Sequence, residues 1–261
     1  MVSVITNFPQ IFKNGCMMND HDHDHDHDHD HDHDYNYNYN YNYKCLNLES
    51  SLVMAEWTFT SHKSCFTDVL PDGCRDIIVK ECDGKAPIVF VSELSQSAYT
   101  VPTIRGSHIR GLRLRPGIQI FHDELQFWLQ NRNPTEIFES DQFSEFCLES
   151  ENLTDALQCL ASGKRTVPAA AKELGVSLRT LERLVKKGTE RSPYFWFSLA
   201  RARKTARSLY EVDSLSVAAL EGGFTDQSHM NREIKKWFRK TPTQILKDKY
   251  VRSALQEAGY G

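Results

Sequence analysis

Several features of membrane and exported proteins are missing from this 261-residue sequence. No run of 18 or more apolar residues occurs, so we expect no transmembrane helix and no membrane partner. The first 20 residues lack the basic stretch and clean apolar core of a secretion signal, so we expect no export. With 40% hydrophobic and 25% charged residues, the chain has the composition of a globular protein of one or two domains.

Cysteines are few, and none form a recognisable pattern. The chain has seven, an odd number, and no Cys-x-x-Cys pair. This pattern argues against a disulfide framework or a zinc site and is typical of a reducing cytoplasm. We therefore predict a cytoplasmic protein with no metal and no cofactor, whose cysteines act as small buried hydrophobes.

Charge is divided unevenly along the chain, although the net charge is only -4. Residues 1–53 and 54–163 each carry a net charge of -7, whereas residues 164–261 hold 20 Lys/Arg against 10 Asp/Glu, net +10. Such asymmetry is expected when one domain meets a polyanion and the rest does not. We place a domain boundary where the charge changes, at Gly163–Lys164.

A low-complexity segment, HDHDHDHDHDHDHD followed by YNYNYNYNY, occupies residues 21–43. Alternating Asp and His cannot bury a core, so we expect residues 1–53 to form a disordered tail. Two alternatives remain open. The seven imidazoles of the tract can bind divalent ions, or the tract is not translated and the protein starts at Met54.

Residues 54–120 have the features of a β-rich domain. Short apolar or alternating runs (WTFT, DIIVKEC, PIVFVSEL, HIRGLRLRPG) are separated by the turn signals PDG, DGK and RG, which predicts a small barrel or sandwich. From residue 121 the pattern is helical, and residues 121–163 are expected to form linker or dimerisation helices. The predicted fold class is therefore α+β, with a β-rich domain followed by an all-α domain.

Two groups of side chains in this part leave alternatives open. The alternation in GLRLRPG puts leucines on one face and arginines on the other. The arginines either face an anionic effector or form the solvent side of a sheet, and we favour the solvent side for Arg105, Arg110, Arg113 and Arg115. The aromatic side chains are expected in the core rather than around a ligand, namely Trp57, Phe127 and Trp128.

The basic C-terminal third contains one motif twice. The stretches VPAAAKELGVSLRTLERLVKK (167–187) and VAALEGGFTDQSHMNREIKKWFRKTP (217–242) share an Ala-x-x-x-Gly pattern. In a helix-turn-helix the alanine must be small because the second helix crosses close to it, and the glycine adopts the positive φ of the turn. Ala171 and Gly175 of the first copy correspond to Ala219 and Gly223 of the second. Two copies in a basic region predict two helix-turn-helix units.

Apolar spacing supports both units and a helix between them. The connecting stretch SPYFWFSLARARKTARSLY predicts a helix from Pro193, a favoured first helical residue, which would hold both units on one rigid body. Its basic residues are expected in solvent (Arg201, Arg203, Lys204, Arg207). The predicted cores are Ala170, Leu174, Val176, Leu181 and Leu184 in the first unit, and Ala218, Phe224, Met230, Ile234, Trp237 and Phe238 in the second.

The exposed faces of the second helices are expected to enter the major groove of DNA. Arg can pair with guanine, Asn or Gln with adenine and Glu with cytosine, while Lys neutralises phosphates. A solvated helix face is the alternative for any one residue, and partial burial is a further alternative for His229. The predicted DNA-binding residues are Ser177, Arg179, Thr180, Glu182, Arg183 and Lys186, then Gln227, Ser228, His229, Asn231, Arg232, Lys235 and Lys236.

On these motifs, residues 167–246 resemble the DNA-binding domain of the AraC/XylS family of bacterial transcription regulators. The resemblance is carried by Ser192-Pro193, Arg201, VAALEGGFTDQSHMNREIKKWF and KTPTQI. Arg239 stands where the family usually has Gly, and Ile234 where it usually has an aromatic residue. The resemblance implies a seven-helix bundle, which we place at residues 164–250 ahead of a tail at 251–261.

The same resemblance implies a function. A regulator of this family places two recognition helices in successive major grooves of double-stranded promoter DNA, so RNA polymerase is an expected partner and the nucleoid an expected location. VLPDGCRDIIV and RGLRLRPGIQI resemble the N-terminal domain of a subset of these regulators. They imply a regulatory domain that senses a small-molecule effector or forms a homodimer.

The alternative is a DNA-alkylation-repair-like enzyme with an AraC-type DNA-binding tail. Such an enzyme needs a nucleophilic, zinc-held cysteine cluster, whereas Cys65, Cys74 and Cys82 lie 9 and 8 residues apart. Arg75 could lower the pKa of Cys74, but no Cys-His arrangement lies nearby. We therefore predict that the chain is not an enzyme.

Overall fold

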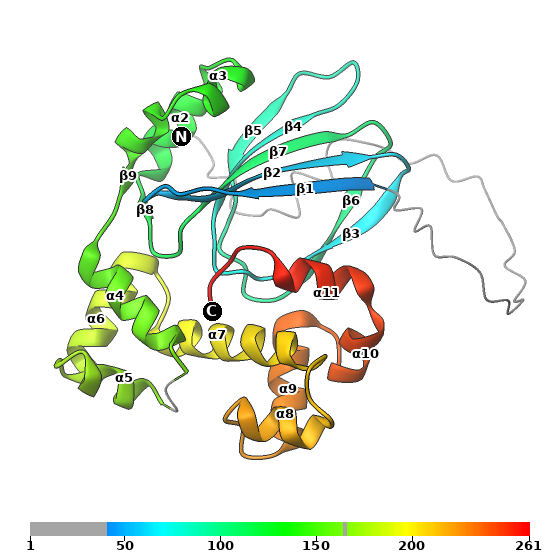
Figure 1. The fold of residues 1–261 in the computed structure, drawn as a ribbon. Helices are drawn as coiled ribbons and strands as arrows, with labels where there is room; N and C mark the ends of the chain where they lie inside the picture. Colours follow the sequence, from blue (N-terminus) through cyan, green and yellow to red (C-terminus); the bar gives the residue numbers. More distant parts are fainter. Residues whose placement is uncertain (1–40, 164–165) are drawn as a thin grey trace, which may run out of the picture.

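A computed structural model describes residues 41–163 and 166–261 of the chain (Figure 1). The His-Asp tract and Cys16 lie outside the described residues, so the metal-binding alternative for the tract stays a prediction. A β-rich part, residues 41–148, precedes a helical part, as the α+β prediction requires. None of the helices in the described part combines the length and the hydropathy that a bilayer crossing requires.

Five antiparallel strands form the main sheet, in the order β1 (Tyr41–Asn47), β2 (Val53–Ser61), β7 (His108–Leu114), β4 (Asp76–Glu81) and β5 (Ile88–Val91). A second pair, β3 (Cys65–Val69) and β6 (Tyr99–Thr103), lies below this sheet in Figure 1. A short pair joins β8 (Gln119–Ile120) to β9 (Cys147–Leu148). The described strands close no barrel, and their arrangement is compatible with a sandwich.

Strand β1 comes from a region expected to be a disordered tail. It pairs with β2 in continuous register from Tyr41 opposite Ser61 to Asn47 opposite Ala55. The Tyr-Asn alternation has the period of a strand, so successive tyrosines lie on the same face. The Tyr41 ring stacks on Phe59 at 4.8 Å. The structure therefore differs from the expectation for residues 41–53, and Met54 lies inside β2 rather than at the start of the fold.

One face of the main sheet packs against helices. Leu112 and Leu114 of β7 form a buried cluster with Leu125 and Leu129 of α2 (His122–Gln130) and Ile137 of α3 (Pro134–Glu139). The 3-10 helix η1 (Gln142–Phe146) adds Phe143 to the same cluster. Phe127, expected in the core, is instead 71% exposed on the outer side of α2. The opposite face of the sheet is left to face β3 and β6.

Seven consecutive helices form the helical domain. They are α4 (Glu151–Ala161), α5 (Val167–Glu173), α6 (Leu178–Thr189), α7 (Pro193–Ser208), α8 (Leu215–Glu221), α9 (Gln227–Phe238) and α10 (Pro242–Lys247). Leu153 and Leu157 of α4 are buried in the same core as α5, α6 and α7. The boundary expected at Gly163–Lys164 therefore falls inside this domain, because α4 is acidic on its outer side but apolar where it packs.

Both predicted helix-turn-helix units are present, α5–α6 and α8–α9, at opposite ends of α7 (Figure 1). Ala171 and Ala219 are buried at the helix crossings, and Gly175 and Gly223 have φ values of 67° and 68°. The predicted second core is buried throughout. In the first core Val176 is 37% exposed and Val185 is buried instead. Val185 lies one turn after Leu181, on the same face of α6.

A last helix, α11 (Lys249–Gln256), turns back from α10 toward the β-rich part (Figure 1). Residues 257–261, which we call the terminal segment, continue from it between the two parts of the molecule. Tyr260 in this segment is 5% exposed and belongs to the core of the helical domain. The stretch expected to be a plain tail is therefore packed on both parts of the molecule.

Candidate nucleic-acid interface and interdomain pocket

Each recognition helix begins at a capped N-terminus. The Ser177 hydroxyl accepts a hydrogen bond from the Thr180 backbone N–H at 3.1 Å and so caps α6. The Asp226 carboxylate accepts from the His229 backbone N–H at 2.7 Å and caps α9. Such caps satisfy N–H groups that a helix start otherwise leaves unpaired. Ser177 therefore caps α6, and its contact with DNA stays a prediction.

The outer face of α6 is polar and open. Its predicted DNA-binding residues are exposed, whereas Leu181 and Val185 on the opposite face are fully buried. Within the described residues, no ion pair engages the guanidinium of Arg179 or Arg183. Two arginines with unoccupied hydrogen-bond donors can form paired bonds with an acceptor such as guanine or phosphate. The exposed set is Arg179, Thr180, Glu182, Arg183 and Lys186.

The predicted residues of α9 divide into two groups. Ser228, Arg232, Lys235 and Lys236 are exposed. The exposed Lys236 ammonium lies 3.8 Å from the carboxylate of Glu233, a half-buried residue three positions earlier on the same helix. These side chains form the open face of the second unit.

Three other predicted residues of α9 are half-buried. Gln227 accepts a hydrogen bond from the Ser216 hydroxyl at 3.2 Å. The His229 ring lies edge-on to Phe224, with 5.3 Å between ring centroids, which is the packed arrangement considered as an alternative. The Asn231 side-chain oxygen is buried and has no hydrogen-bond partner among the described residues. These three side chains are therefore packed partly within the second unit and are only partly available to DNA.

Helix α7 fixes both recognition helices. The Trp196 indole N–H donates to the Thr189 hydroxyl at the end of α6, at 2.8 Å. The Trp237 indole N–H donates to the Ser198 hydroxyl at 3.0 Å, and that hydroxyl donates to Glu233 of α9 at 2.5 Å. Both tryptophans are buried. Their hydrogen bonds therefore fix the orientation of α6 and α9 against α7, in addition to the apolar packing between these helices. The two exposed faces are therefore presented by one rigid support.

Both recognition helices end on a non-glycine residue in the left-handed region. Glu190 after α6 has φ 60° and Arg239 after α9 has φ 55°. At each end the backbone N–H still donates to the carbonyl four residues earlier. Arg239, at the position where the resemblance led us to expect Gly, therefore adopts the left-handed geometry of such a helix end, with strain from its side chain.

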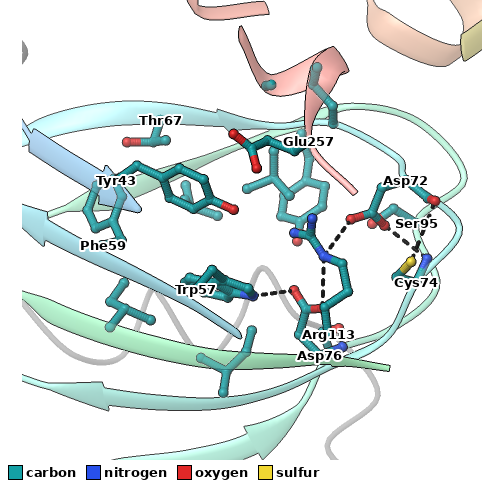
Figure 2. Close-up of a pocket in the computed structure, with 18 of the residues that line it drawn as sticks. Tyr43, Trp57, Phe59, Thr67, Asp72, Cys74, Asp76, Ser95, Arg113 and Glu257 are labelled. Carbon is teal, nitrogen blue, oxygen red and sulfur yellow. Dashed lines mark hydrogen bonds and ion pairs between the residues drawn. The ribbon is translucent and has the colours of Figure 1, made fainter. Parts of the chain in front are cut away.

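A second feature of the molecule is a pocket of about 420 Å³ between the main sheet, the β3–β6 pair and the helices α7 and α11 (Figure 2). Aromatic rings form most of its apolar wall. The Trp57 ring lies across Gly111 of the neighbouring strand, where a Cβ atom would be 2.2 Å from the indole. The aromatic lining consists of Tyr41, Tyr43, Trp57, Phe59, Phe90, Tyr99 and Tyr250.

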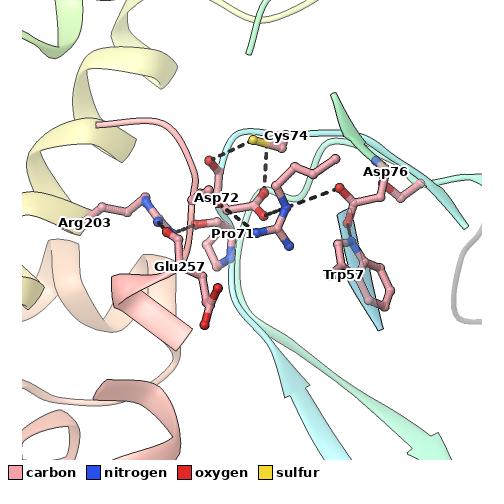
Figure 3. A network of polar contacts seen from close by, with 10 residues as sticks. Trp57, Pro71, Asp72, Cys74, Asp76, Arg203 and Glu257 are labelled. Carbon is pink, nitrogen blue, oxygen red and sulfur yellow. Dashed lines mark hydrogen bonds and ion pairs between the residues drawn. The ribbon is translucent and has the colours of Figure 1, made fainter. Parts of the chain in front are cut away.

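A buried ion-pair network lies at one end of the pocket (Figures 2 and 3). The Arg113 guanidinium is 3.2 Å from the Asp72 carboxylate and 3.3 Å from that of Asp76, and it donates to the Ala258 carbonyl at 2.8 Å. The Trp57 indole N–H also donates to Asp76, at 3.2 Å. Burial raises the pKa of Asp76 to about 6, and Arg113 opposes this effect.

This network corrects the prediction for Arg113. Its side chain was expected on the solvent side of the sheet, but the residue is only 9% exposed and bound to two carboxylates. The alternation in β7 is as predicted, since Leu112 and Leu114 lie on the opposite face. Arg113 is buried because its side of β7 meets the terminal segment, which the local sequence pattern does not show. Arg110 lies on the leucine side instead, over the Phe138 ring at 4.0 Å and 3.0 Å from Glu56.

Arg203 of α7 also departs from expectation. It was expected in solvent but is 1% exposed. Its guanidinium donates to the Pro71 carbonyl at 3.2 Å and to the Glu257 carbonyl at 3.4 Å (Figure 3). Burial lowers the pKa of Arg203 to about 10, so it stays protonated at neutral pH. A residue of the helix that supports both recognition helices thus lines the pocket.

Cys74 is not an activated thiol. It is fully buried, and burial together with the Asp72 carboxylate holds its pKa well above the ordinary value. The sequence allowed for the opposite effect from Arg75, but the Arg75 guanidinium lies 3.7 Å from Glu190 instead. The six cysteines in the described part of the chain are free thiols, and no cluster of metal-ligating side chains was found there.

Sequence reasoning missed most of the pocket. Tyr43 lies in the low-complexity repeat, where the period-two alternation was a strand signal. Asp72 lies in the stretch VLPDGCRDIIV, which was singled out only for its resemblance. Glu257 and Tyr260 lie near the chain end, and no local pattern marks them as pocket or core residues. Pocket residues from β1, β2, β7, α7 and α11 come together only through the tertiary fold.

Comparison with known proteins gives one family match and several structural likenesses. A family described as a helix-turn-helix domain matches residues 170–248. No curated protein matches the chain. A transcriptional regulator with an AraC-type DNA-binding domain from Chromobacterium violaceum is 23% identical over 41% of this chain and 95% of that one, with a TM-score of 0.33.

Two further solved structures are similar. The C-terminal domain of AraT, a response regulator from Geobacillus stearothermophilus, is 22% identical over 40% of this chain and 86% of that one, with a TM-score of 0.34. ToxT from Vibrio cholerae O395 is 9% identical over 84% of this chain and 99% of that one, with a TM-score of 0.41. At these values the likenesses carry no argument of their own, and nothing in them supports the enzyme alternative.

The assignment rests on the matched family and on the geometry of the matched residues. They contain two capped helix-turn-helix units on one supporting helix, each with an open basic face. Residues 170–248 are therefore a double helix-turn-helix domain, which supports a DNA-binding transcription regulator.

Proposed function

We propose that α6 and α9 lie in successive major grooves of one promoter duplex. The observation that carries this proposal is the attachment of both helices to α7, with their outer faces exposed. Arg179 and Arg183 of α6 and Arg232 of α9 then read base edges, since exposed arginines suit guanine. Lys186, Lys235 and Lys236 neutralise phosphates. Thr180, Glu182 and Ser228 lie on the same faces and add hydrogen bonds.

The remaining predicted residues support the interface rather than reading bases. Ser177 caps α6, so its hydroxyl reaches DNA only at the cost of that cap. Gln227, His229 and Asn231 lie on the half-buried side of α9. We propose that these three position the second unit, and that their substitution disturbs all DNA sequences alike.

The test compares site-specific and non-specific binding. We expect Arg183→Ala or Arg232→Ala to lose about 1–3 kcal/mol of discrimination between the specific site and other DNA. Lys236→Ala should weaken binding to every sequence, and the slope of log affinity against log salt should fall by about one phosphate contact. Lys63→Ala, an exposed lysine of the β-rich part, serves as the charge-matched control. Unchanged footprints and site preference in Arg183→Ala would show that the orientation assigned to the first unit is wrong.

We infer that the β-rich part senses a small-molecule effector in the interdomain pocket. Arg203 connects the pocket lining to α7, and α7 holds both recognition helices through Trp196 and Ser198. A ligand that shifts Arg203 or α11 would therefore change how the two helices are presented. For a regulator that acts at promoters, we propose RNA polymerase as a protein partner and the nucleoid as the location. Mapping of bound DNA across the genome would give the operator and its position relative to promoters.

Homodimerisation is the second candidate role for residues 41–148. Phe127 is 71% exposed in the middle of α2, whose inner face is buried against the sheet. An exposed large aromatic on an otherwise packed helix suits contact with a second copy of the chain. Sedimentation of the wild type and of Phe127→Ser would test this role, which requires a dimer in the wild type and its loss in the variant.

A further inference from the structure

The interdomain pocket has features that select one class of ligand, if it is the effector site proposed above. Its volume of about 420 Å³ is in the range of small-molecule sites. Its wall is aromatic, and its charged lining consists of four carboxylates, Asp72, Asp76, Glu93 and Glu257, and three cations, Lys80, Arg113 and Arg203. The balance of charge is negative, so the state of each charged group decides which ligand fits.

The cations of the lining are already engaged. Arg113 is bound to Asp72, Asp76 and the Ala258 carbonyl. Arg203 donates through its two terminal nitrogens to the carbonyls of Pro71 and Glu257, whereas its Nε has no hydrogen-bond partner among the described residues. Lys80 also has an interaction partner. An anionic ligand would have to break the Arg113 network and leave two buried carboxylates without their cation, which is strongly unfavourable.

Two lining carboxylates, Glu93 and Glu257, form no ion pair with another described residue; Glu93 is exposed, so the half-buried one is Glu257. It reaches into the pocket from the end of α11, beside the Tyr43 side chain (Figure 2). No ion pair with another described residue compensates its charge. The Cys45 thiol lies close enough to respond to it, because burial and this carboxylate together raise the pKa of Cys45 to about 11. The pocket thus contains an uncompensated negative charge beside aromatic rings.

We propose that the pocket binds an organic cation, an amine or quaternary ammonium carried on an aromatic or other apolar body. The cationic group lies against the Glu257 carboxylate and the faces of Tyr43 and Trp57, and the apolar body lies among the remaining rings. Aromatic faces attract such cations through their quadrupole, most strongly in a desolvated site. A neutral ligand of the same shape fills the volume but leaves the Glu257 charge desolvated and unpaired.

The location of Glu257 connects binding to the DNA-binding domain. The carbonyl of the same residue accepts a hydrogen bond from Arg203 of α7. A cation that pulls the Glu257 side chain toward the pocket also acts on this backbone contact. The proposed ligand is therefore sensed at the junction of the terminal segment and α7.

The experiment uses three probes of nearly the same shape on the full chain. They are (1-naphthylmethyl)trimethylammonium, its neutral isostere with a tert-butyl group in place of trimethylammonium, and 1-naphthylacetate as the anion. Isothermal titration measures their affinities at pH 7.5. We expect the cation to bind about tenfold or more tighter than the neutral probe, and the anion to bind weakest. Equal or tighter binding of the anion overturns the proposal.

Two matched variants locate the effect. Glu257→Gln keeps the shape of the side chain and removes its charge, and we expect it to weaken cation binding about tenfold while leaving the neutral probe unchanged. Glu139→Gln makes the same change at an exposed position of α3 and should alter neither probe. An equal loss for the cation and the neutral probe in Glu257→Gln would mean that the residue shapes the pocket without recognising charge, which contradicts the proposal.

DNA binding measured on the same samples separates this inference from the proposed function. A chain that binds promoter DNA but none of the three probes contradicts the ligand class and leaves the DNA interface intact. A chain that binds the cation selectively with no effect on its DNA affinity or footprint supports the site but contradicts effector sensing. Selective cation binding that changes the DNA affinity supports both.

Discussion

At the scale of single residues, Asp76 is a carboxylate whose environment opposes its charge. Its side chain is 14% exposed, accepts hydrogen bonds from Arg113 and the Trp57 indole, and has Asp72 as a second carboxylate nearby. Burial and Asp72 favour the protonated form, while Arg113 and Trp57 favour the charged form. Burial dominates, so the pKa rises from its ordinary 3.8 to about 6.

This shift predicts a pH dependence of stability with a defined sign. Between pH 6 and pH 4 the folded chain holds a proton on Asp76 that the unfolded chain releases, so the free energy of unfolding gains a contribution as the pH falls. Relative to Asp76→Asn, the wild type should gain on the order of 1–2 kcal/mol between pH 7 and pH 4.5. Urea unfolding of both proteins at the two pH values measures this difference.

The exposed Asp141→Asn provides the control, because its comparison with the wild type should not show that gain. Other carboxylates titrate equally in both proteins of each pair and cancel. A difference between wild type and Asp76→Asn that is constant from pH 7 to pH 4.5, or that changes in the opposite direction, would contradict the assignment of a raised pKa to Asp76.

At the scale of elements, the two recognition helices share an end that is strained. Glu190 and Arg239 occupy the left-handed conformation that glycine adopts without a steric penalty. Arg239→Gly should therefore raise the free energy of unfolding by about 1 kcal/mol, and Glu190→Gly by a similar amount. Urea unfolding midpoints report the change. Arg239→Gly should also weaken DNA binding slightly if this arginine touches phosphate.

The matched control places glycine in the interior of the same helix. Lys235→Gly removes an exposed lysine of α9 and should lower the free energy of unfolding by about 1 kcal/mol. If Arg239→Gly destabilises the protein as Lys235→Gly does, the strain at the helix end is offset by contacts of the arginine side chain.

Elements with a strong local period could be predicted from the sequence, and elements that depend on distant partners could not. Ala171, Gly175, Ala219 and Gly223 fixed both helix-turn-helix units because their roles are local to each turn. Strand β3, in which Thr67 is the buried residue, and helix α3, in which Ile137 is the buried residue, are too short to show a period. Strand β1 contains a tyrosine repeat with the period of a strand, but the repeat was interpreted as part of a disordered low-complexity segment.

The candidate site likewise contains residues that the sequence predicts and residues that it does not. Exposed charges on α6 were predictable because a helix with a buried face has an exposed one. The half-burial of Asn231 and the full burial of Arg203 depend on α7 and the terminal segment, which lie far away in the sequence. The pocket needs strands, α7 and α11 at once, so no single stretch predicts it.

At the scale of the whole molecule, the terminal segment joins the β-rich part to the helical domain. The Tyr260 backbone N–H donates to the Asp72 carbonyl at 2.7 Å, and its hydroxyl donates to the Leu157 carbonyl of α4 at 2.8 Å. Arg113 of β7 binds the Ala258 carbonyl from the other side. Further contacts join Lys240 to Asp68 at 3.1 Å. Most of these bonds cross from one part of the molecule to the other.

Tyr260→Ala should therefore uncouple the two parts. Truncating a buried aromatic side chain costs about 3–5 kcal/mol, and here the loss falls on the contact between the domains. We expect one calorimetric transition in the wild type and two in Tyr260→Ala, with the recognition helices still folded and DNA still bound. Tyr194→Ala, a 50% exposed tyrosine of α7, should keep the single transition. A single transition in Tyr260→Ala at a merely lower temperature would show that the other interdomain contacts suffice, and that the terminal segment does not control the coupling of pocket and DNA-binding domain.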